Sequence, residues 1–398
     1  MRLALETALI ANLAFLLGMA TYSVVLVMAG AIARRETPAP SERRRRFAVL
    51  VPAHNEEALI ARTLDSLDHL DYPRHLFDIH VIADNCDDAT AAIARGYTRF
   101  VHERDEPSDR GKGQALRWLL DRLPGGAYDA FAVVDADSVV SRNLLSAFND
   151  RMESGFVAVQ AYYGVLNPER SWVSALRGAA FCILQGTRRR GLSALGASAG
   201  LGGNGMAFSF ELKAARNWDA FSVTEDLELH AKLVVAGVKV AFAPEAVVLG
   251  EMPDSLAAAR DQNLRWERGR LALARAYAPG LLADGLRSRR WPSLAAAFDL
   301  MIPPLSTHGL MGGVLLAVAI FIGSPVAIGM AAAVLAGIAV YVIAGLAAAR
   351  APLRLWLALG FAPLFIVWKA WLYAGALVSR RKPSWTRTRR LNSGDEAR

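Results

Sequence analysis

Two aspartates stand at alternate positions in the segment Asp135-Ala-Asp137, directly after the apolar run 130–134. Carboxylates placed in this way can approach one hard divalent cation through their oxygens, and such a cation can neutralise a diphosphate. The segment therefore predicts a Mg²⁺ or Mn²⁺ site. The alternative for an isolated pair of this kind is a turn whose aspartates cap a helix.

Phosphate binding is predicted for the segment Arg110-Gly-Lys-Gly-Gln114, which is expected to open a helix. Glycines let a phosphate come close to the backbone N–H groups at a helix start, and Lys112 adds a positive charge. A glycine pair before a helix is also common in loops that bind nothing. This motif gains its weight from the others.

A proton acceptor is predicted in Ser222-Val-Thr-Glu-Asp226, which precedes a helical stretch. A sugar hydroxyl must lose its proton as it attacks an anomeric carbon, so Asp226 is a candidate general base. Thr224 is the expected N-cap. The simpler interpretation is that Glu225 and Asp226 only complement the positive end of the helix dipole.

The segment Gln262-Asn-Leu-Arg-Trp266 places an amide, a guanidinium and an indole at helical spacing. We expect Gln262 to lie beside Arg265 and Trp266 on one helix face. Arginine can bind a diphosphate with two N–H groups, and tryptophan can stack on the apolar face of a sugar ring. The alternative is an amphipathic helix with a partly buried tryptophan near a membrane.

Three short apolar runs, 47–51, 78–83 and 130–134, each end in polar or acidic residues and are followed by helical stretches. Strand, polar loop and helix repeated in this order predict an α/β domain with a mostly parallel, doubly wound sheet. In such sheets ligands bind at the carboxyl ends of the strands. The polar segments after the three runs should therefore share one site.

The chain has 398 residues, of which 54% are hydrophobic, and a positive mean hydropathy of +0.25. These values are too apolar for an ordinary soluble protein. No charged residue occurs from Thr7 to Ala33, a length sufficient to span a bilayer, and arginines follow it. The order predicts an uncleaved anchor, with the residues after Arg34 in the cytosol. A second apolar zone, residues 300–378, divides into three pieces of membrane length.

The formal net charge of +8 comes largely from arginine runs beside the apolar segments. Such runs predict contact with anionic lipid headgroups rather than with nucleic acid. The two cysteines, Cys86 and Cys182, have no metal-ligand spacing, which favours a reducing compartment and gives no support to a disulfide framework.

In order along the chain, these motifs resemble those of the membrane-embedded family 2 glycosyltransferases, the group of cellulose, chitin and hyaluronan synthases and ceramide glucosyltransferase. The similarity covers roughly positions 47–270 and rests on Val51-Pro-Ala-His-Asn-Glu-Glu57, Asp84, Asp135-Ala-Asp137, Thr224-Glu-Asp226 and Gln262-x-x-Arg-Trp266. Five ordered motifs are much more specific than any one of them. The resemblance implies a GT-A fold and an inverting, metal-dependent transfer from a nucleotide sugar, with UDP as the expected nucleotide.

The resemblance also implies roles for individual residues. It assigns the donor nucleotide and its diphosphate to Pro52, Asn55, Glu56, Asp84, Lys112 and Asp135. It makes Asp137 the direct metal ligand, with Asp135 beside it, and Asp226 the catalytic base. It assigns the diphosphate and the acceptor to Asn204, Glu225, Gln262, Arg265 and Trp266, with Asn204 as a polar contact at the acceptor entrance.

The expected organisation is an N-terminal transmembrane anchor (1–35), a cytosolic GT-A domain (36–280), an interfacial linker (281–299), C-terminal membrane helices (300–379) and a basic cytosolic tail (380–398). Four crossings would leave the basic tail outside, against the positive-inside rule. The last apolar segment contains Pro363, Lys369 and several aromatic residues, which is typical of a helix lying at the interface. We therefore predict that this segment does not cross and that Ser324 faces outward. The alternative is that the Pro303-Pro304 segment is the one that does not span.

The expected function is transfer of one sugar from a nucleotide sugar to a membrane lipid or a lipid-linked saccharide, at a bacterial inner membrane with the catalytic domain in the cytosol. Asn263 and the short membrane region differ from the polymer synthases, so a processive polysaccharide synthase is the second hypothesis. A membrane-anchored nucleotide-sugar sensor without turnover is the third. A transporter is least favoured, because the apolar zones carry few ionisable residues apart from His308 and Lys369.

Overall fold

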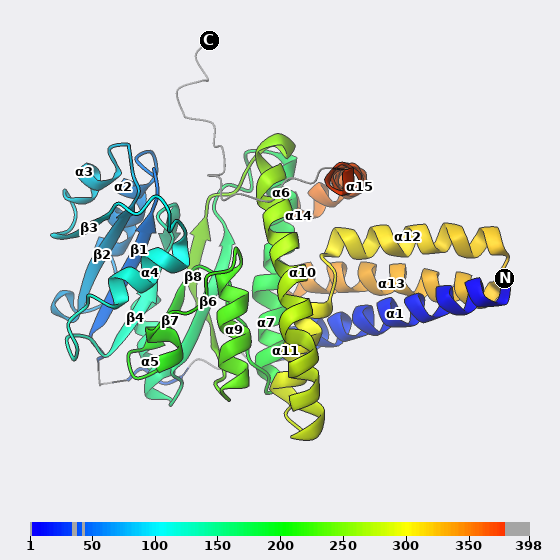
Figure 1. Cartoon of the computed structure of the whole chain (residues 1–398), viewed down its shortest axis with the longest axis horizontal. Helices are drawn as coiled ribbons and strands as arrows, with labels where there is room; N and C mark the ends of the chain where they lie inside the picture. Colours follow the sequence, from blue (N-terminus) through cyan, green and yellow to red (C-terminus); the bar gives the residue numbers. More distant parts are fainter. Residues whose placement is uncertain (1, 34–37, 42–43, 379–398) are drawn as a thin grey trace, which may run out of the picture.

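The computed structural model describes residues 2–33, 38–41 and 44–378. It consists of a sheet domain, a bundle of three long apolar helices, and a layer of helices between them (Figure 1). In Figure 1 the long helices of the intermediate layer run nearly at right angles to those of the bundle.

One eight-stranded sheet forms the centre of the domain, with the strand order β3-β2-β1-β4-β7-β6-β8-β5. The strands are β1 (Phe47–Ala53), β2 (Phe77–Asp84), β3 (Phe100–Arg104), β4 (Ala130–Val133), β5 (Ser138–Val140), β6 (Ala158–Val165), β7 (Met206–Ser209) and β8 (Ala241–Gly250). The first four in this order are parallel, as are β6 and β8, whereas β7 is antiparallel to both neighbours and β5 to β8. The sheet is thus mixed, and the predicted parallel arrangement holds for the half that contains the three apolar runs.

Both faces of the sheet are covered, which explains why its strands are apolar at successive positions rather than at alternate ones. Along β1, Phe47, Val49 and Val51 pack into one core cluster and Ala48 and Leu50 into the other. The helices of the sheet domain are α2 (Ile60–Asp68), η1 (Arg74–Leu76), α3 (Thr90–Ala94), α4 (Lys112–Leu120), α5 (Leu144–Glu153), α8 (Lys213–Arg216) and α9 (Glu225–Val235). Leucines of α2 and α5 enter the first cluster, and leucines of α4 and α9 enter the second.

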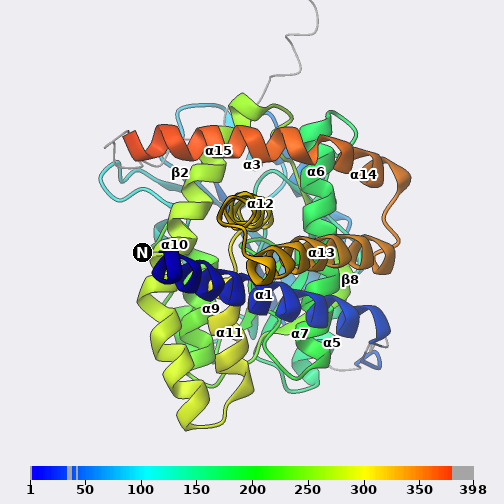
Figure 2. The same ribbon diagram turned by 90° about the vertical axis from the view of Figure 1, so that its right-hand side faces the viewer.

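The intermediate layer lies between the sheet and the bundle (Figures 1 and 2). It contains α6 (Trp172–Phe181), the π-helical turn η2 (Cys182–Thr187), α7 (Arg188–Ala194), α10 (Leu256–Arg287) and α11 (Trp291–Met301). Three further elements follow the bundle in the sequence: α14 (Leu353–Ala358), η3 (Leu359–Phe361) and α15 (Ala362–Val378). The predicted domain boundary at residue 280 falls inside α10, which continues for 32 residues without a break. The predicted linker is therefore the end of one helix and most of the next.

The bundle consists of α1 (Arg2–Ile32), α12 (Leu305–Ile322) and α13 (Pro325–Ala348). Figure 1 shows α1 running from the far tip of the bundle toward the sheet domain, with the turn between α12 and α13 at the same tip. There the Ser324 hydroxyl donates to Glu6 Oε1 at 2.5 Å. In the described part of the chain, four segments are long and apolar enough to cross a membrane: 3–32, 305–322, 325–348 and 353–373.

The fourth of these segments, which forms α14 and α15, lies across the bundle. Figure 2 shows α15 lengthwise and α12 nearly end-on. Glu267 of α10 accepts hydrogen bonds from Lys369 and Tyr373 of α15, and the Tyr373 and Thr307 hydroxyls are 2.6 Å apart. These contacts join α15 to the intermediate layer, and its position at the interface stays a prediction. The predicted tail, 380–398, lies outside the described residues.

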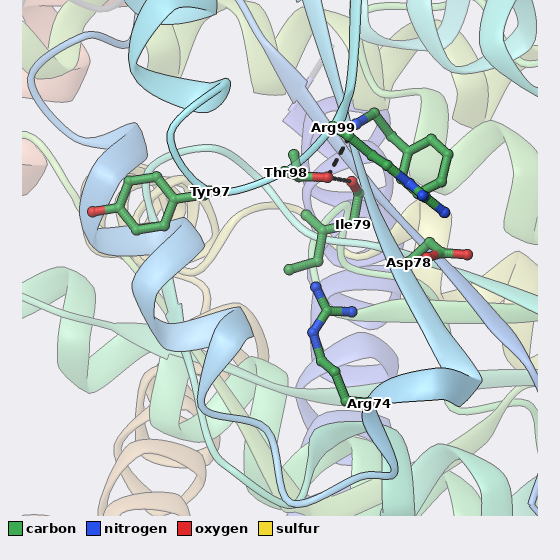
Figure 3. A pocket seen from close by; sticks show the side chains of 7 residues that line it. Arg74, Asp78, Ile79, Tyr97, Thr98 and Arg99 are labelled. Atoms are coloured by element: carbon green, nitrogen blue, oxygen red, sulfur yellow. Dashed lines mark hydrogen bonds between the residues drawn. The ribbon is translucent and has the colours of Figure 1, made fainter.

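A cavity of about 340 Å³ opens at the edge of the sheet formed by β2 and β3 (Figure 3). Arg74, Asp78, Tyr97 and Arg99 are among its lining residues. It lies at the start of β2, on the side of the sheet opposite to the carboxyl ends of the parallel strands. This cavity is therefore separate from the predicted site.

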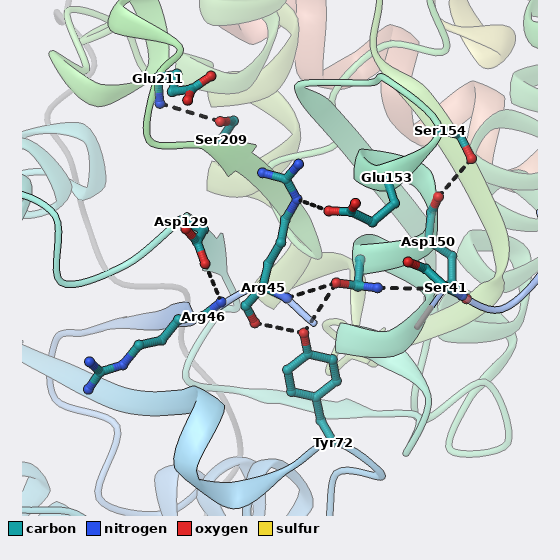
Figure 4. Close-up of polar contacts among 11 residues, drawn as sticks. Ser41, Arg45, Arg46, Tyr72, Asp129, Asp150, Glu153, Ser154, Ser209 and Glu211 are labelled. Atoms are coloured by element: carbon teal, nitrogen blue, oxygen red, sulfur yellow. Dashed lines mark hydrogen bonds and ion pairs between the residues drawn. The ribbon is translucent and has the colours of Figure 1, made fainter. Parts of the chain in front are cut away.

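The arginines that precede β1 contact protein groups, where the sequence predicted lipid headgroups (Figure 4). Arg45 forms an ion pair with Glu153 at 2.7 Å, and its backbone N–H donates to Asn149 Oδ1. Arg46 donates its backbone N–H to Asp129 Oδ2 at 2.8 Å. The Arg45 side chain is thus paired within the protein, and lipid contact by the arginine runs stays a prediction.

The orientation of α15 predicts the accessibility of two introduced cysteines. In a chain with Cys86 and Cys182 replaced by alanine, a cysteine at Val326 near the bundle tip should react with a membrane-impermeant thiol reagent in intact cells. A cysteine at Ser393 should react only after permeabilisation. Labelling at Ser393 in intact cells would mean that α15 crosses the membrane.

Candidate active site

The carboxyl ends of the strands bring together three motifs that are far apart in the sequence. Lys112, the first residue of α4, lies with its Nζ 2.5 Å from Asp135 Oδ1 and 3.8 Å from Glu225 Oε1. The same Nζ donates to the backbone carbonyl of Gly203. One ammonium group thus joins the glycine-containing segment, the aspartate pair after β4, the start of α9 and the 200–205 loop.

The charges of this cluster are strongly coupled because the groups are buried. Burial acts to lower the pKa of Lys112, but Asp135 and Glu225 outweigh it and the pKa is raised. Burial raises the pKa of Asp135 to about 6 and that of Glu225 to about 7, although Lys112 acts in the opposite direction on both. Lys112 therefore stays charged. The sequence predicted a phosphate contact for Lys112, and its ion pair with Asp135 was not predicted.

The Asp135-Ala-Asp137 turn offers part of a cation site. Asp137 Oδ1 accepts from the Ser138 hydroxyl at 3.1 Å, and the negative charge of Asp137 raises the pKa of Asp135 after burial does. Within the described residues there is no group of three or more His, Cys, Asp or Glu side chains arranged to hold a metal. A divalent cation at this turn would take one or two carboxylates from the protein and its other ligands from a bound phosphate or water. The local excess of carboxylates fits such a cation.

The resemblance placed Asn204 at an acceptor entrance. The structure does not support this, because the Asn204 side chain is fully buried. Its Oδ1 accepts from the backbone N–H of Asp135 at 3.1 Å, and its Nδ2 donates to Ser138 Oγ at 2.7 Å. The amide therefore fixes both ends of the aspartate turn. Asn204 is a positioning residue beneath the predicted metal ligands.

Two buried residues that the sequence analysis missed, Gln160 and Arg189, fix the 200–205 loop. Gln160 donates to the carbonyl of Asn204 at 2.8 Å and accepts from the backbone N–H of Gly202 at 2.8 Å. Arg189 donates to the carbonyls of Ala199 and Gly200. Gln160 lies in β6 and Arg189 in α7. Neither segment has a sequence feature that distinguishes it from an ordinary strand or helix, so only the structure shows that the two side chains bind this loop.

Asp226 lies in the first turn of α9, beside the 200–205 loop. A Cβ built on Gly203 would be 3.5 Å from Asp226 Oδ2, which shows how close this carboxylate comes to the loop backbone. Burial raises the pKa of Asp226. The backbone N–H of Leu227 and the positive charges of Lys112 and Arg189 act to lower this pKa but do not outweigh the effect of burial. A carboxylate with a raised pKa at a helix start is suited to accept a proton near neutral pH.

Thr224 occupies the position before α9, but its side chain makes no capping hydrogen bond. Its Oγ1 is buried and has no hydrogen-bond partner in the described part of the chain. A Cβ on Gly269 of α10 would lie 2.8 Å from Thr224, so close helix packing occupies the space around this hydroxyl. The predicted side-chain cap is therefore wrong.

The predicted nucleotide residues gather at the ends of β1 and β2. Asp84 Oδ1 accepts from Arg104 Nη1 at 2.6 Å, an ion pair in which the arginine side chain is 2% exposed. Asn55 exchanges two hydrogen bonds with Asp87, and the Glu56 backbone N–H donates to Thr90 Oγ1. Pro52 is in β1, directly before this loop. These hydrogen bonds connect the loop after β1 to the loop after β2 and hold the two loops in place at this edge of the sheet.

A cavity of about 650 Å³ lies beside this edge and is lined in part by Arg104, Gln114, Trp118 and Phe221. Arg104 connects the cavity to Asp84. The sequence analysis missed Arg104. The only sequence feature that could have indicated its role is its position as the last residue of β3, the strand that follows β2, which ends at Asp84. Through Arg104 this cavity lies next to one of the predicted nucleotide residues.

The side chains of the Gln262–Trp266 segment in α10 contact two different parts of the protein. Gln262 Oε1 accepts from Arg177 Nη1 of α6 at 2.7 Å, and the Arg177 Cζ lies 5.5 Å from the centroid of the Trp266 ring. Arg265 is influenced by Glu225 instead: burial lowers the pKa of Arg265 and Glu225 acts to raise it. The segment therefore approaches the carboxylate cluster with Arg265, and it contacts α6 with Gln262 and Trp266.

Comparison with known proteins is consistent with this geometry. Residues 44–269, more than half of the chain, match the family described as Glycosyltransferase like family 2. A probable glycosyltransferase YdaM of Bacillus subtilis is 25% identical over 289 residues, which cover 70% of this chain and 66% of that protein. A beta-monoglucosyldiacylglycerol synthase of Trichormus variabilis is 28% identical over 268 residues, 65% of this chain and 56% of that protein. The chain thus matches less than two thirds of the length of these relatives.

Among solved structures, the mannosyltransferase PcManGT of Pyrobaculum calidifontis, in complex with GDP-Man and Mn²⁺, has a TM-score of 0.54 with 20% identity. The alignment covers 95% of this chain and 98% of that one. At this identity the similarity shows a shared fold. Four apolar segments of the described chain are long enough to cross a membrane, which indicates membrane association. The match over residues 44–269 shows that the chain belongs to glycosyltransferase family 2 and is a glycosyltransferase.

Proposed function

We propose that this glycosyltransferase moves a sugar, with inversion, from a UDP-sugar to a hydroxyl of a membrane lipid or a lipid-linked saccharide. The observation that carries the proposal is the cluster around Lys112, which brings Asp135 within 2.5 Å and Glu225 within 3.8 Å, next to Asp226 in the same helix turn as Glu225. A candidate base and a candidate diphosphate site thus lie side by side, and Arg265 of α10 and Arg189 of α7 lie close enough to affect the pKa values of Glu225 and Asp226.

In the proposed reaction, Asp226 accepts the proton of the acceptor hydroxyl as its oxygen bonds to the anomeric carbon. The bond from that carbon to the diphosphate oxygen breaks, and its electron pair leaves with the nucleoside diphosphate. Arg265 is placed to offset the negative charge that develops on this leaving group. A divalent cation held by Asp137 and Asp135 would supply further neutralisation of the diphosphate.

Support for a nucleotide-sugar donor and a divalent cation comes from PcManGT, whose structure contains GDP-Man and Mn²⁺. The choice of UDP rests on the motif resemblance. Asn55, Glu56 and Asp84 would contact the base and ribose, because they line the edge next to the 650 Å³ cavity that Arg104 shares. Lys112 would move from Asp135 to the diphosphate when donor binds, since a phosphate offers more negative charge than one carboxylate.

A lipid acceptor is supported by the beta-monoglucosyldiacylglycerol synthases among the relatives and by the helix layer beside the site. The second candidate is a processive synthase. It is favoured by a relative named poly-beta-1,6-N-acetyl-D-glucosamine synthase, from Staphylococcus epidermidis, which is 25% identical over 233 residues, 56% of this chain and 54% of that protein. We place the sheet domain on the cytosolic side of a bacterial inner membrane, because arginines follow α1.

The decisive experiment is incubation of membranes containing the protein with a panel of labelled nucleotide sugars, followed by lipid extraction and mass spectrometry. One added sugar on a lipid would support the proposal, whereas a long product would support the processive alternative. Absence of any transferred or hydrolysed sugar would favour a sensor without turnover.

Asp226→Asn should lower kcat by ~10²-fold or more, because the amide cannot accept the acceptor proton. UDP affinity, measured by calorimetry, should change less than about twofold, since a base that acts in the transition state is not needed for nucleotide binding. Asp219→Asn is the matched control, as this exposed aspartate pairs only with Lys232. A parallel loss of UDP affinity in the Asp226 variant would reject the base assignment.

The raised pKa of Asp226 predicts an acid limb in the pH profile. A general base works in its deprotonated form, so kcat/KM should fall as the pH drops through this raised value. The limb should lie above 3.8, the usual pKa of an aspartate. Measurement of kcat/KM between about pH 4 and pH 9 tests it, and a profile that stays flat down to about pH 4 would show that the base is not desolvated in the working enzyme.

Asp137→Ala should remove the dependence of UDP affinity on Mn²⁺, because the diphosphate would lose the cation that offsets its charge. The measurement is a UDP titration at several Mn²⁺ concentrations, which does not require turnover. Asp219→Ala serves as the control, and it should keep the wild-type metal dependence. Unchanged metal dependence in Asp137→Ala would disprove the ligand assignment.

A further inference from the structure

Arg177 is a buried arginine without a carboxylate partner. It lies in the second turn of α6 and is 6% exposed. Its Nη1 donates to Gln262 Oε1 at 2.7 Å and lies 3.8 Å from Met252 Sδ. Its Nε and Nη2 have no hydrogen-bond partner anywhere in the part of the chain that the structure describes.

Two other buried arginines have carboxylate partners. Arg104 is paired with Asp84 at 2.6 Å and Arg151 with Glu245 at 3.0 Å. Burial lowers the pKa of Arg177 to about 10, against an opposing effect of Tyr163. A buried guanidinium with two unused donors costs free energy unless a partner from outside the chain binds it.

The two unused nitrogens are adjacent, because Nε and Nη2 form one edge of the planar guanidinium. Two parallel N–H groups on such an edge match the spacing of two oxygens of a phosphate or carboxylate. The other side is already used by Gln262, and the Trp266 ring lies 5.5 Å from Cζ. The free edge is therefore shaped to bind an oxyanion in two places.

Two contacts link Arg177 to the aspartate turn. Asn167 exchanges hydrogen bonds of 2.8 and 2.9 Å with the backbone of Met252 and so fixes the residue that faces Arg177. The preceding Glu251 donates its backbone N–H to the carbonyl of Asp137. Arg177 is thus connected through Met252 and Glu251 to the predicted metal ligand, and its helix is part of the intermediate layer.

We propose that Arg177 binds a phosphate group of the lipid acceptor, so that the natural acceptor is a phosphate-bearing membrane lipid rather than a neutral one. This inference rests on the proposed function. The donor diphosphate already has Lys112 and Arg265 at the carboxylate cluster, whereas Arg177 contacts Gln262 and Trp266, which point away from that cluster toward α6. Arg177 would hold the headgroup and leave its hydroxyl to Asp226.

A binding experiment with two short lipids tests the proposal on the full-length protein in detergent. Dihexanoyl phosphatidic acid carries a phosphate, and dihexanoylglycerol has the same acyl chains without it. Wild-type protein should bind the phosphate-bearing lipid at least ~10-fold more tightly, in line with a charge-assisted bidentate contact. Arg177→Gln should lose this preference, and Arg177→Lys should recover part of it, because lysine keeps the charge without the planar edge.

Arg170→Gln is the matched control, since Arg170 precedes the same helix but is half exposed and pairs with Glu251. It should retain the wild-type preference. UDP affinity should be unchanged in Arg177→Gln, which also shows that the variant is folded. Inorganic phosphate should compete only weakly, because it lacks the acyl chains.

Equal affinity of the wild type for both lipids, or an unchanged preference in Arg177→Gln, would overturn the proposal. A parallel loss of UDP affinity would assign Arg177 to the donor, and tight competition by inorganic phosphate would assign it to a soluble ligand. Failure of the proposed function appears separately, as absence of nucleotide-sugar hydrolysis or transfer by a protein that still distinguishes the two lipids.

Discussion

The placement of one buried ammonium group among several carboxylates is the interaction on which the site depends. Lys112 begins α4 and contacts Asp135, while Glu225 begins α9 and lies 3.8 Å from the same nitrogen. Removal of this charge would leave carboxylates facing one another in a buried space, where repulsion is poorly screened. The strand order brings these groups together, because β4 lies between β1 and β7 in the sheet.

The sequence was sufficient for the part of the fold that repeats a local rule. Apolar runs followed by polar segments predicted β1, β2 and β4 and the edge at which their ligands meet, and hydropathy predicted α1, α12 and α13. It could not predict which side chains would be used inside the protein. Asn204 looks like a flexible loop residue, yet burial of its amide under Asp135 decides its role.

The same limit applies to charges whose partners are distant in sequence. Arg177 lies 85 positions from Gln262, and Arg104 lies 20 positions from Asp84. Neither pairing follows from spacing, because the contacts arise from helix packing and from strand order. The protein partners of the arginines before β1 were missed for the same reason: a run of positive charge does not reveal that Asp129 and Glu153 lie beside it.

One short helix, α7, connects the bundle of apolar helices to the 200–205 loop. On α7, Arg188 pairs with Asp299 of α11, while the next residue, Arg189, binds the carbonyls of Ala199 and Gly200 in the loop beside Asp226. Gly191 of the same helix lies so close to α1 that a Cβ there would overlap the carbonyl of Leu26. Because α1 and α11 fix α7 from two sides, the position of the loop beside the base depends on how the apolar helices pack. A lipid acceptor that enters from the bilayer would then meet a base whose surroundings are set by the membrane helices themselves.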